Sequence, residues 1–154
     1  MEYAIVKWLH VLSSTVLFGT GVGSAFYMLR ASLNRDAAVA HFVAKQVVIA
    51  DWIFTATTVV LQPVSGLYLA HLAHMPLTAR WLLWSLILYF LAGACWLPVV
   101  WIQIRMRDLS GQAAEQGREL PDAYWDLFRI WFTLGIPAFL ALVVVFYLMV
   151  VKPA

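Results

Sequence analysis

Hydrophobic residues follow one another in four long runs, separated by short polar stretches. The runs are Tyr3 to Leu29, Val47 to Leu69, Trp81 to Ile104 and Tyr124 to Val151. Each reaches the roughly 20 residues that a helix needs to cross a hydrocarbon layer of about 30 Å. Lipid cannot hydrogen-bond the backbone, and the runs are too long for barrel strands, so each run predicts a helix.

The pattern therefore predicts an all-α integral membrane protein, a four-helix up-down-up-down bundle. We expect a single transmembrane domain over residues 1–154, with helices at about 3–29, 47–73, 80–107 and 122–151. Composition agrees, because 64% of the residues are hydrophobic, 12% are charged and the mean hydropathy is +0.84. These values lie outside the range of soluble domains. The lipid bilayer is the expected partner, and a net charge of +2 divided among the loops does not indicate a nucleic-acid surface.

The positive charges favour one orientation. Seven Lys and Arg residues lie near the first and third connections, and three lie on the other side: Arg30, Arg35, Lys45, Arg105, Arg107, Arg118 and Arg129, against Lys7, Arg80 and Lys152. Connections rich in Lys and Arg stay in the cytoplasm. We therefore expect a multi-pass protein of the bacterial inner (cytoplasmic) membrane with both termini in the periplasm.

Polar residues inside the runs fall on one stripe of each helix. On the second run, positions 51, 55, 58, 62 and 65 lie within roughly 80° at 100° per residue. The stripes are Asp51, Thr55, Thr58, Gln62 and Ser65; His10, Ser14, Gly21 and Ser24; Ser85, Tyr89, Trp96 and Gln103; and Asp126, Arg129, Thr133 and Pro137. Polar groups that face lipid lose their hydrogen bonds, so the four stripes predict a polar interior. Most of the small and hydroxylated residues are interpreted as contacts between helices.

Ionisable residues within membrane spans indicate a function or a structural pair. We expect Asp51 to form a structural ion pair with Arg129, or with Arg105 if the third helix intervenes. His10 lies about 10 Å below the outer surface at 1.5 Å per residue, level with Gln62 to Gly66 of the antiparallel second helix. It is either a core histidine bonded to Gln62 or Ser65, or a ligand beside the space left by Gly66 and Pro63.

A second group of candidate metal ligands lies at the C-terminal end of the second predicted helix. His71, His74 and Met75 combine two imidazoles with a thioether, a set that suits copper, whose reduced form prefers soft ligands. His and Met are also ordinary residues of the membrane interface. A metal site would use these three residues, with or without His10.

Short motifs along nearly the whole chain resemble an uncharacterised family of bacterial four-helix inner-membrane proteins. They are Lys7-Trp8-Leu9-His10-Val11-Leu12, Phe18-Gly19-Thr20-Gly21, Asp51-Trp52, Leu61-Gln62-Pro63-Val64-Ser65-Gly66, Cys95-Trp96-Leu97-Pro98-Val99-Val100, Trp131, Gly135-Ile136-Pro137-Ala138 and Tyr147-Leu148-Met149. More distantly, the Leu-His of the first helix is similar to that of the copper-resistance D-type membrane proteins and the HemJ-type protoporphyrinogen oxidases. The HemJ-type likeness implies haem b bound by His10. No full set of partner residues accompanies it.

Three functions stay open. The first is a haem-binding or redox-linked bundle, with His10 as axial ligand and Gln62, Gly66 and His71 as further cofactor contacts. The second is a copper-handling or small-solute transport protein that uses His10, His71, His74 and Met75. The third is an accessory subunit without chemistry of its own, whose stripes bind a membrane partner or a second copy of the chain. The sequence does not decide whether the chain is an enzyme.

The orientation is testable with fusions to alkaline phosphatase, which is active only outside the cytoplasm. A fusion after Ala154 should be active and a fusion at Gly111 inactive, because the charge asymmetry holds the connections at residues 30–46 and 105–120 inside. Activity of the Gly111 fusion with loss of activity after Ala154 would show that the protein is inverted.

Overall fold

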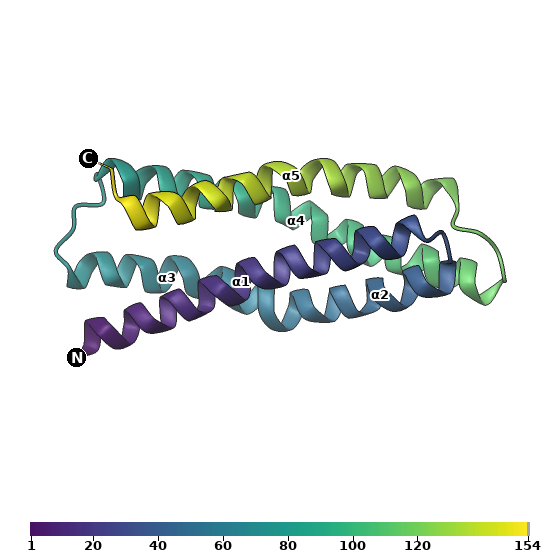
Figure 1. The fold of residues 1–154 in the computed structure, drawn as a ribbon, viewed down its shortest axis with the longest axis horizontal. Helices are drawn as coiled ribbons and strands as arrows, with labels where there is room; N and C mark the ends of the chain where they lie inside the picture. Colours follow the sequence, from purple (N-terminus) through teal and green to yellow (C-terminus); the bar gives the residue numbers. More distant parts are fainter. Residues whose placement is uncertain (154) are drawn as a thin grey trace.

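The computed structural model describes residues 1–153 as a bundle of long helices (Figure 1). The elements are α1 (Glu2–Leu33), α2 (Ala37–Ala50), a short π-helix η1 (Asp51–Thr55), α3 (Ala56–Leu72), α4 (Arg80–Glu115) and α5 (Asp122–Val151). Because α2, η1 and α3 follow without a break, the described residues contain four helices long and apolar enough to cross a membrane. The predicted all-α, four-span fold is confirmed.

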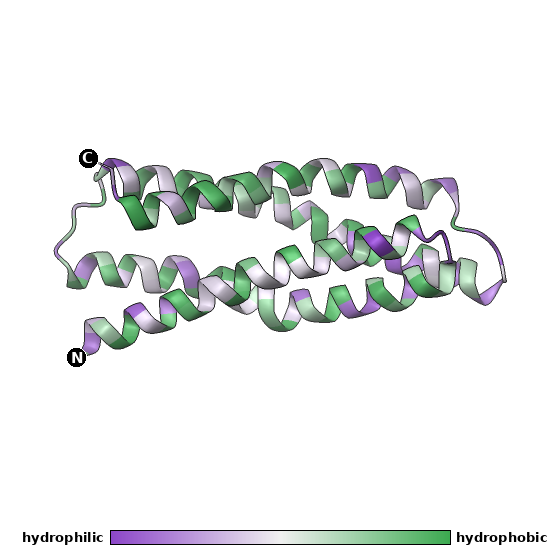
Figure 2. Cartoon of the chain, viewed as in Figure 1, coloured by the Kyte–Doolittle hydropathy of each residue, from purple (hydrophilic) through white to green (hydrophobic). Residues whose placement is uncertain are grey.

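Hydropathy follows the long axis of the bundle. Hydrophobic residues predominate along the helices, and hydrophilic residues gather at the connections and near the chain ends (Figure 2). Both termini lie at one end, which we call the terminal end, and the α1–α2 and α4–α5 connections lie at the other, which we call the core end (Figure 1). The antiparallel order agrees with the predicted topology.

The helices pack unequally along the bundle. α4 packs along α5, α2 packs against α4, and α1 packs against α2, η1 and α3. The buried hydrophobic cluster lies mainly at the core end and contains Met28, Ala37, Ala40, Val47, Ile102, Met106, Ala113, Leu120, Tyr124 and Trp131. Toward the terminal end, α1 pairs with α3 and α4 pairs with α5 (Figure 1). The two pairs are therefore joined chiefly through α2 and α4.

The second and third spans are longer than the hydrophobic runs predicted. The second begins at Ala37 rather than near residue 47, because Asp36 caps it: its carboxylate accepts hydrogen bonds from the backbone N–H groups of Ala38 and Val39 at 2.8 and 3.1 Å. The third continues to Glu115 rather than ending near residue 107. Both extensions carry small residues on the faces that meet, so packing extends the helices beyond their apolar segments.

A glycine permits the closest contact between these extensions. A Cβ atom built on Gly111 would lie 2.9 Å from both Cε1 and Nδ1 of His41. The same imidazole Nδ1 is 2.9 Å from the backbone oxygen of Arg107, to which it donates its proton. Gly111 thus lets the α2 histidine hydrogen-bond to the backbone of α4.

Replacing Gly111 with Ala should destabilise the protein by about 1–3 kcal/mol, the usual penalty for overpacking a tight contact. The added methyl group would displace His41 and weaken its hydrogen bond to Arg107. Thermal unfolding of the purified protein in detergent measures the loss. Gly93→Ala is the matched control on the same helix, because a Cβ atom at Gly93 meets nothing within 4 Å. Equal thermal unfolding temperatures of Gly111→Ala and Gly93→Ala would show that the contact between Gly111 and His41 does not contribute to stability.

Candidate functional site

The second span departs from regular α-helix at two places. Its middle is the π-helix Asp51–Thr55, and Pro63 lies inside α3. A π-helical turn often marks a functional position, because it inserts a residue and rotates the side chains that follow. Proline lacks the N–H that would bond the carbonyl four residues earlier. Here that carbonyl belongs to Val59.

A tyrosine from another helix satisfies this carbonyl. The hydroxyl of Tyr89 on α4 donates a hydrogen bond of 2.7 Å to the backbone oxygen of Val59. An unpaired backbone group within lipid is costly, so the bond compensates for Pro63 and joins α4 to α3 where the helix pairs are otherwise apart. The helical periodicity places Tyr89 on a polar stripe, but its partner depends on the packing of α4 against α3.

The predicted polar interior is confirmed for the second span. Its five stripe residues, Asp51, Thr55, Thr58, Gln62 and Ser65, are all buried, as are Ser85 and Gln103 of the third. The prediction is wrong for the fourth, where Asp126, Arg129, Thr133 and Pro137 are exposed. The buried polar-tipped residues of α5 are instead Tyr124 and Trp131. The charged pair lies near the helix end, where long side chains reach water without turning inward.

Two cavities lie between the helix pairs. The terminal cavity has a volume of about 400 Å³ and includes His10, Gln62 and Gly66 in its lining. The central cavity has a volume of about 390 Å³ and includes Asp51 and Gln103. Four residues line both and form the wall between them: Leu17, Phe18, Tyr89 and Leu142. Both cavities have mostly apolar walls with a few polar groups, the usual form of a small-molecule site.

In the terminal cavity a hydrogen bond fixes the protonation of His10. Its Nδ1 lies 2.7 Å from Oγ of Ser65, and that hydroxyl lies 2.6 Å from the backbone oxygen of Leu61. A serine hydroxyl has one proton, and a carbonyl oxygen can only accept, so the proton of Ser65 goes to Leu61. Nδ1 of His10 must then donate to Ser65. In the neutral imidazole, this tautomer leaves Nε2 unprotonated, with its lone pair free.

Gln62 and Gly66 of α3 also contact His10. The Gln62 amide Nε2 donates to the backbone oxygen of His10 at 2.9 Å and to Oγ of Ser13. A Cβ atom on Gly66 would lie 3.2 Å from Cε1 of His10, so the missing side chain gives the ring its room. The predicted closeness of His10 to Gln62, Ser65 and Gly66 is confirmed. Ser13, one position from the predicted Ser14, is the serine that bonds across to α3.

Cationic and sulfur-bearing side chains also line the terminal cavity. Lys7, Lys152 and Met75 belong to the lining, and Nζ of Lys152 lies 5.4 Å from the centre of the Trp81 ring. The cavity thus combines an apolar body with two ammonium groups near the chain ends. The charge pattern placed Lys7 and Lys152 on the same side of the membrane, but only the fold shows that both line one cavity.

The structure does not assemble the predicted copper ligands. His71 and His74 are exposed and do not line the terminal cavity, although Met75 does. Within residues 1–153, no three His, Cys, Asp or Glu side chains group as metal ligands. His74 adopts a left-handed backbone conformation with φ 51° in the turn after α3. His71, also predicted as a cofactor contact, is therefore not part of the cavity that contains His10.

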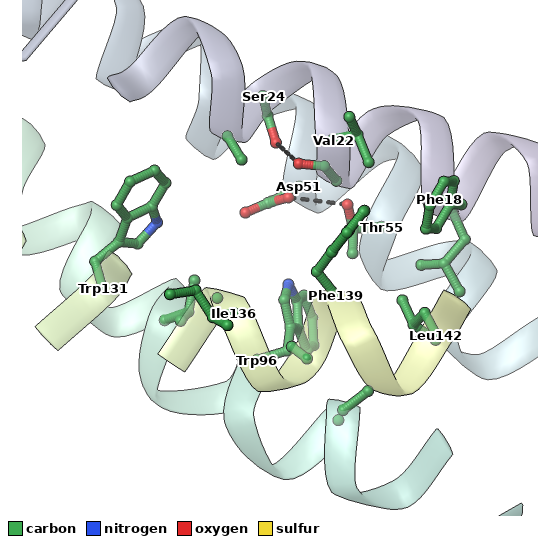
Figure 3. A pocket seen from close by; sticks show the side chains of 18 of the residues that line it. Phe18, Val22, Ser24, Asp51, Thr55, Trp96, Trp131, Ile136, Phe139 and Leu142 are labelled. Atoms are coloured by element: carbon green, nitrogen blue, oxygen red, sulfur yellow. Dashed lines mark hydrogen bonds between the residues drawn. The ribbon is translucent and has the colours of Figure 1, made fainter. Parts of the chain in front are cut away.

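The central cavity holds a buried carboxyl group (Figure 3). One oxygen of Asp51 accepts a hydrogen bond of 2.8 Å from the hydroxyl of Thr55, and the side chain points into the space bounded by Trp96 and Trp131. Asp51 is 5% exposed and Gln103 is 4% exposed. Oδ2 of Asp51 and Oε1 of Gln103 have no hydrogen-bond partner among the described residues.

The predicted ion pair of Asp51 is not formed. Arg129 instead bonds to Asp126, three residues earlier on α5, at 3.1 Å, and both side chains are exposed. Arg105 is also exposed. Neither arginine lies within 4.0 Å of the Asp51 carboxyl group in the part of the chain that the structure describes. Asp51 faces the interior, as its polar stripe predicted, whereas α5 carries Arg129 outward, where it pairs with Asp126.

A family model described as "Predicted integral membrane protein (DUF2269)" matches residues 4–153. The chain belongs to this family. The match covers nearly the whole chain, and it agrees with the resemblance to an uncharacterised membrane family. Neither the curated proteins nor the solved structures contain a significant match, so nothing in them supports the more distant likeness to copper-resistance D-type or HemJ-type proteins.

The hydrogen bond of Tyr89 yields a test by double mutation. Tyr89→Phe should destabilise the protein by about 0.5–2 kcal/mol, because it leaves the Val59 carbonyl without a donor. Pro63→Ala supplies a backbone N–H for the same carbonyl, so Tyr89→Phe should cost less in that background. Thermal unfolding of the four proteins in one detergent measures the coupling. Strictly additive effects would contradict the proposed compensation.

Proposed function

We propose that the protein binds haem b in the terminal cavity through Nε2 of His10, as a redox-linked member of its family. The observation that supports this most is the tautomer of His10, because a metal ligand needs an unprotonated nitrogen. Metal-bound histidines usually donate their other ring N–H to a neighbouring acceptor, which fixes the ring. Ser65 is that acceptor here.

The rest of the cavity suits an amphipathic anion with a large apolar body. Its walls are mainly aliphatic and aromatic, and Lys7 and Lys152 line it with the cations that haem propionates require. Gly66 keeps the space beside the His10 ring free of a side chain. These features favour haem over a bare metal ion, for which the cavity offers one imidazole only.

Met75 and Met149 both line the same cavity, and either thioether would help His10 to hold the haem iron, since a thioether paired with histidine is an established haem ligand set. Gln62 is less suited, because its amide oxygen is a hard ligand and its N–H group holds the side chain against the backbone of His10 and against Ser13. When bound, haem b supplies one-electron transfer. His10, Ser65 and Lys7 would hold and orient it within the mainly apolar walls of the cavity.

The charge asymmetry of the connections predicts on which side of the membrane the proposed haem site lies. If the core end is cytoplasmic in a bacterial inner membrane, the terminal cavity lies toward the periplasm. Electron exchange with a periplasmic or membrane partner is the role that this placement favours. The partner itself would contact the protein near the chain ends.

Purified protein from haem-replete cells should show a Soret band and a reduced-minus-oxidised difference spectrum, and His10→Ala should abolish both. Ser65→Ala should lower haem affinity by about ten- to a hundredfold, the usual effect of removing the group that orients a metal-bound histidine. Haem titration followed by absorbance measures both effects.

Ser14→Ala is the matched control. Ser14 also lines the terminal cavity, but its hydroxyl bonds only to the backbone of its own helix, at Val11. Its haem affinity should equal that of the wild type. A wild-type protein that stays colourless and binds no added haem, while His10→Ala unfolds at an unchanged temperature, would refute the proposal and favour an accessory role.

A further inference from the structure

We propose that the central cavity is a separate binding site for a lipophilic ammonium ion, held by Asp51 and Gln103. Both side chains are at least nine-tenths buried, and each presents an oxygen that has no hydrogen-bond partner among residues 1–153. Buried polar atoms are rarely left unpaired, because each costs the desolvation of that group. Two unpaired acceptors in one cavity suit a ligand with N–H or O–H donors.

The missing counter-charge favours an ammonium ion over a neutral alcohol. No Lys, Arg or His lines the central cavity, and the described ion pairs do not include Asp51. Tyr89 is the other titratable side chain of the lining. An ionised carboxylate within a membrane is costly unless a cation accompanies it. A bound ammonium ion supplies both the charge and the N–H donors.

The walls suit the apolar part of such a cation. Trp96, Trp131 and Tyr89 line the cavity together with Phe139, and Figure 3 shows the two indole rings on the side opposite Asp51. Aromatic faces attract ammonium ions, most strongly where water is excluded. A carboxylate on one side and aromatic rings on the other is therefore a recognition site for an organic cation.

The cavity also reaches the lipid. Its lining includes Val22 and Phe26 of α1 and Phe132 and Ile136 of α5, which are exposed on the surface of the bundle as well. Nearer the terminal end, the ring of Phe18 closes the α1–α5 side by packing against Phe139 and Phe146, with centroids 5.6 and 5.2 Å apart. The opening between α1 and α5 admits a ligand that partitions into the bilayer.

A set of matched ligands tests the proposal. The probes are 1-aminoadamantane, a compact primary ammonium ion at neutral pH, and 1-adamantanol, its neutral hydroxyl counterpart. Equilibrium dialysis against protein in nanodiscs, corrected with empty nanodiscs, gives their affinities. The amine should bind the wild type at least tenfold more tightly than the alcohol.

Asp51→Asn should weaken amine binding roughly ten- to a hundredfold, the loss expected for a hydrogen bond to a charged group. It should leave the alcohol almost unaffected. Gln103→Leu should weaken amine binding by a smaller factor. Asp126→Asn is the matched control, because it removes an exposed carboxylate from the same bundle without touching the cavity.

Equal affinity for the amine and the alcohol would overturn the ammonium assignment, and it would do so even if Asp51→Asn did not fold. Unchanged amine binding in a folded Asp51→Asn protein would overturn the role of the carboxylate. The site is independent of haem, so the same measurements on His10→Ala should match the wild type. Failure of haem binding would leave this proposal standing.

Discussion

The close packing of α2 against α4 is the contact on which the rest of the bundle depends. Small residues meet there, including Ala40, Ala44 and Gly111, and they bring the backbones close enough for the imidazole of His41 to bond a carbonyl of α4. Without a hydrophobic force between helices in lipid, such close backbone contact is a main source of association. Because the junction lies at the core end, the pairs α1/α3 and α4/α5 can stand apart elsewhere, and their separation produces both cavities.

The second requirement is that every backbone group within the membrane has a partner. The Ala37–Leu72 span departs from regular α-helix twice, at η1 and at Pro63. The hydroxyl of Tyr89 pairs with the carbonyl that Pro63 leaves free, and the same side chain lines both cavities. Tyr89 thus bonds the carbonyl group that lacks a helical partner, connects the α1/α3 pair to the α4/α5 pair, and lies between the terminal and central cavities. The irregular backbone is tolerated because it faces protein and not lipid.

The two cavities differ in the charge they favour. Lys7 and Lys152 make the terminal cavity suited to an anionic ligand, whereas Asp51 makes the central cavity suited to a cation. The two lysines would pair with the anionic groups of one ligand, and Asp51 would pair with the ammonium group of the other. The hydrocarbon of the membrane offers neither ligand such a partner. Such opposite preferences in one small bundle are consistent with a protein that binds two different molecules. They give no support to a single shared ligand.

The sequence alone determined the four spans, their antiparallel order and the buried polar stripe of the second span, because length, hydropathy and helical periodicity are local properties that lipid enforces. It also placed His10 level with Gln62 and Gly66, since antiparallel helices with a short connection have a fixed register. Only the tertiary structure decided that Asp51 faces a cavity and not Arg129, that His71 and His74 lie outside the terminal cavity, and that Lys152 and Lys7 line the same cavity. These outcomes depend on the rotation of each helix about its axis. A π-helical turn changes that rotation without a clear signal in the sequence.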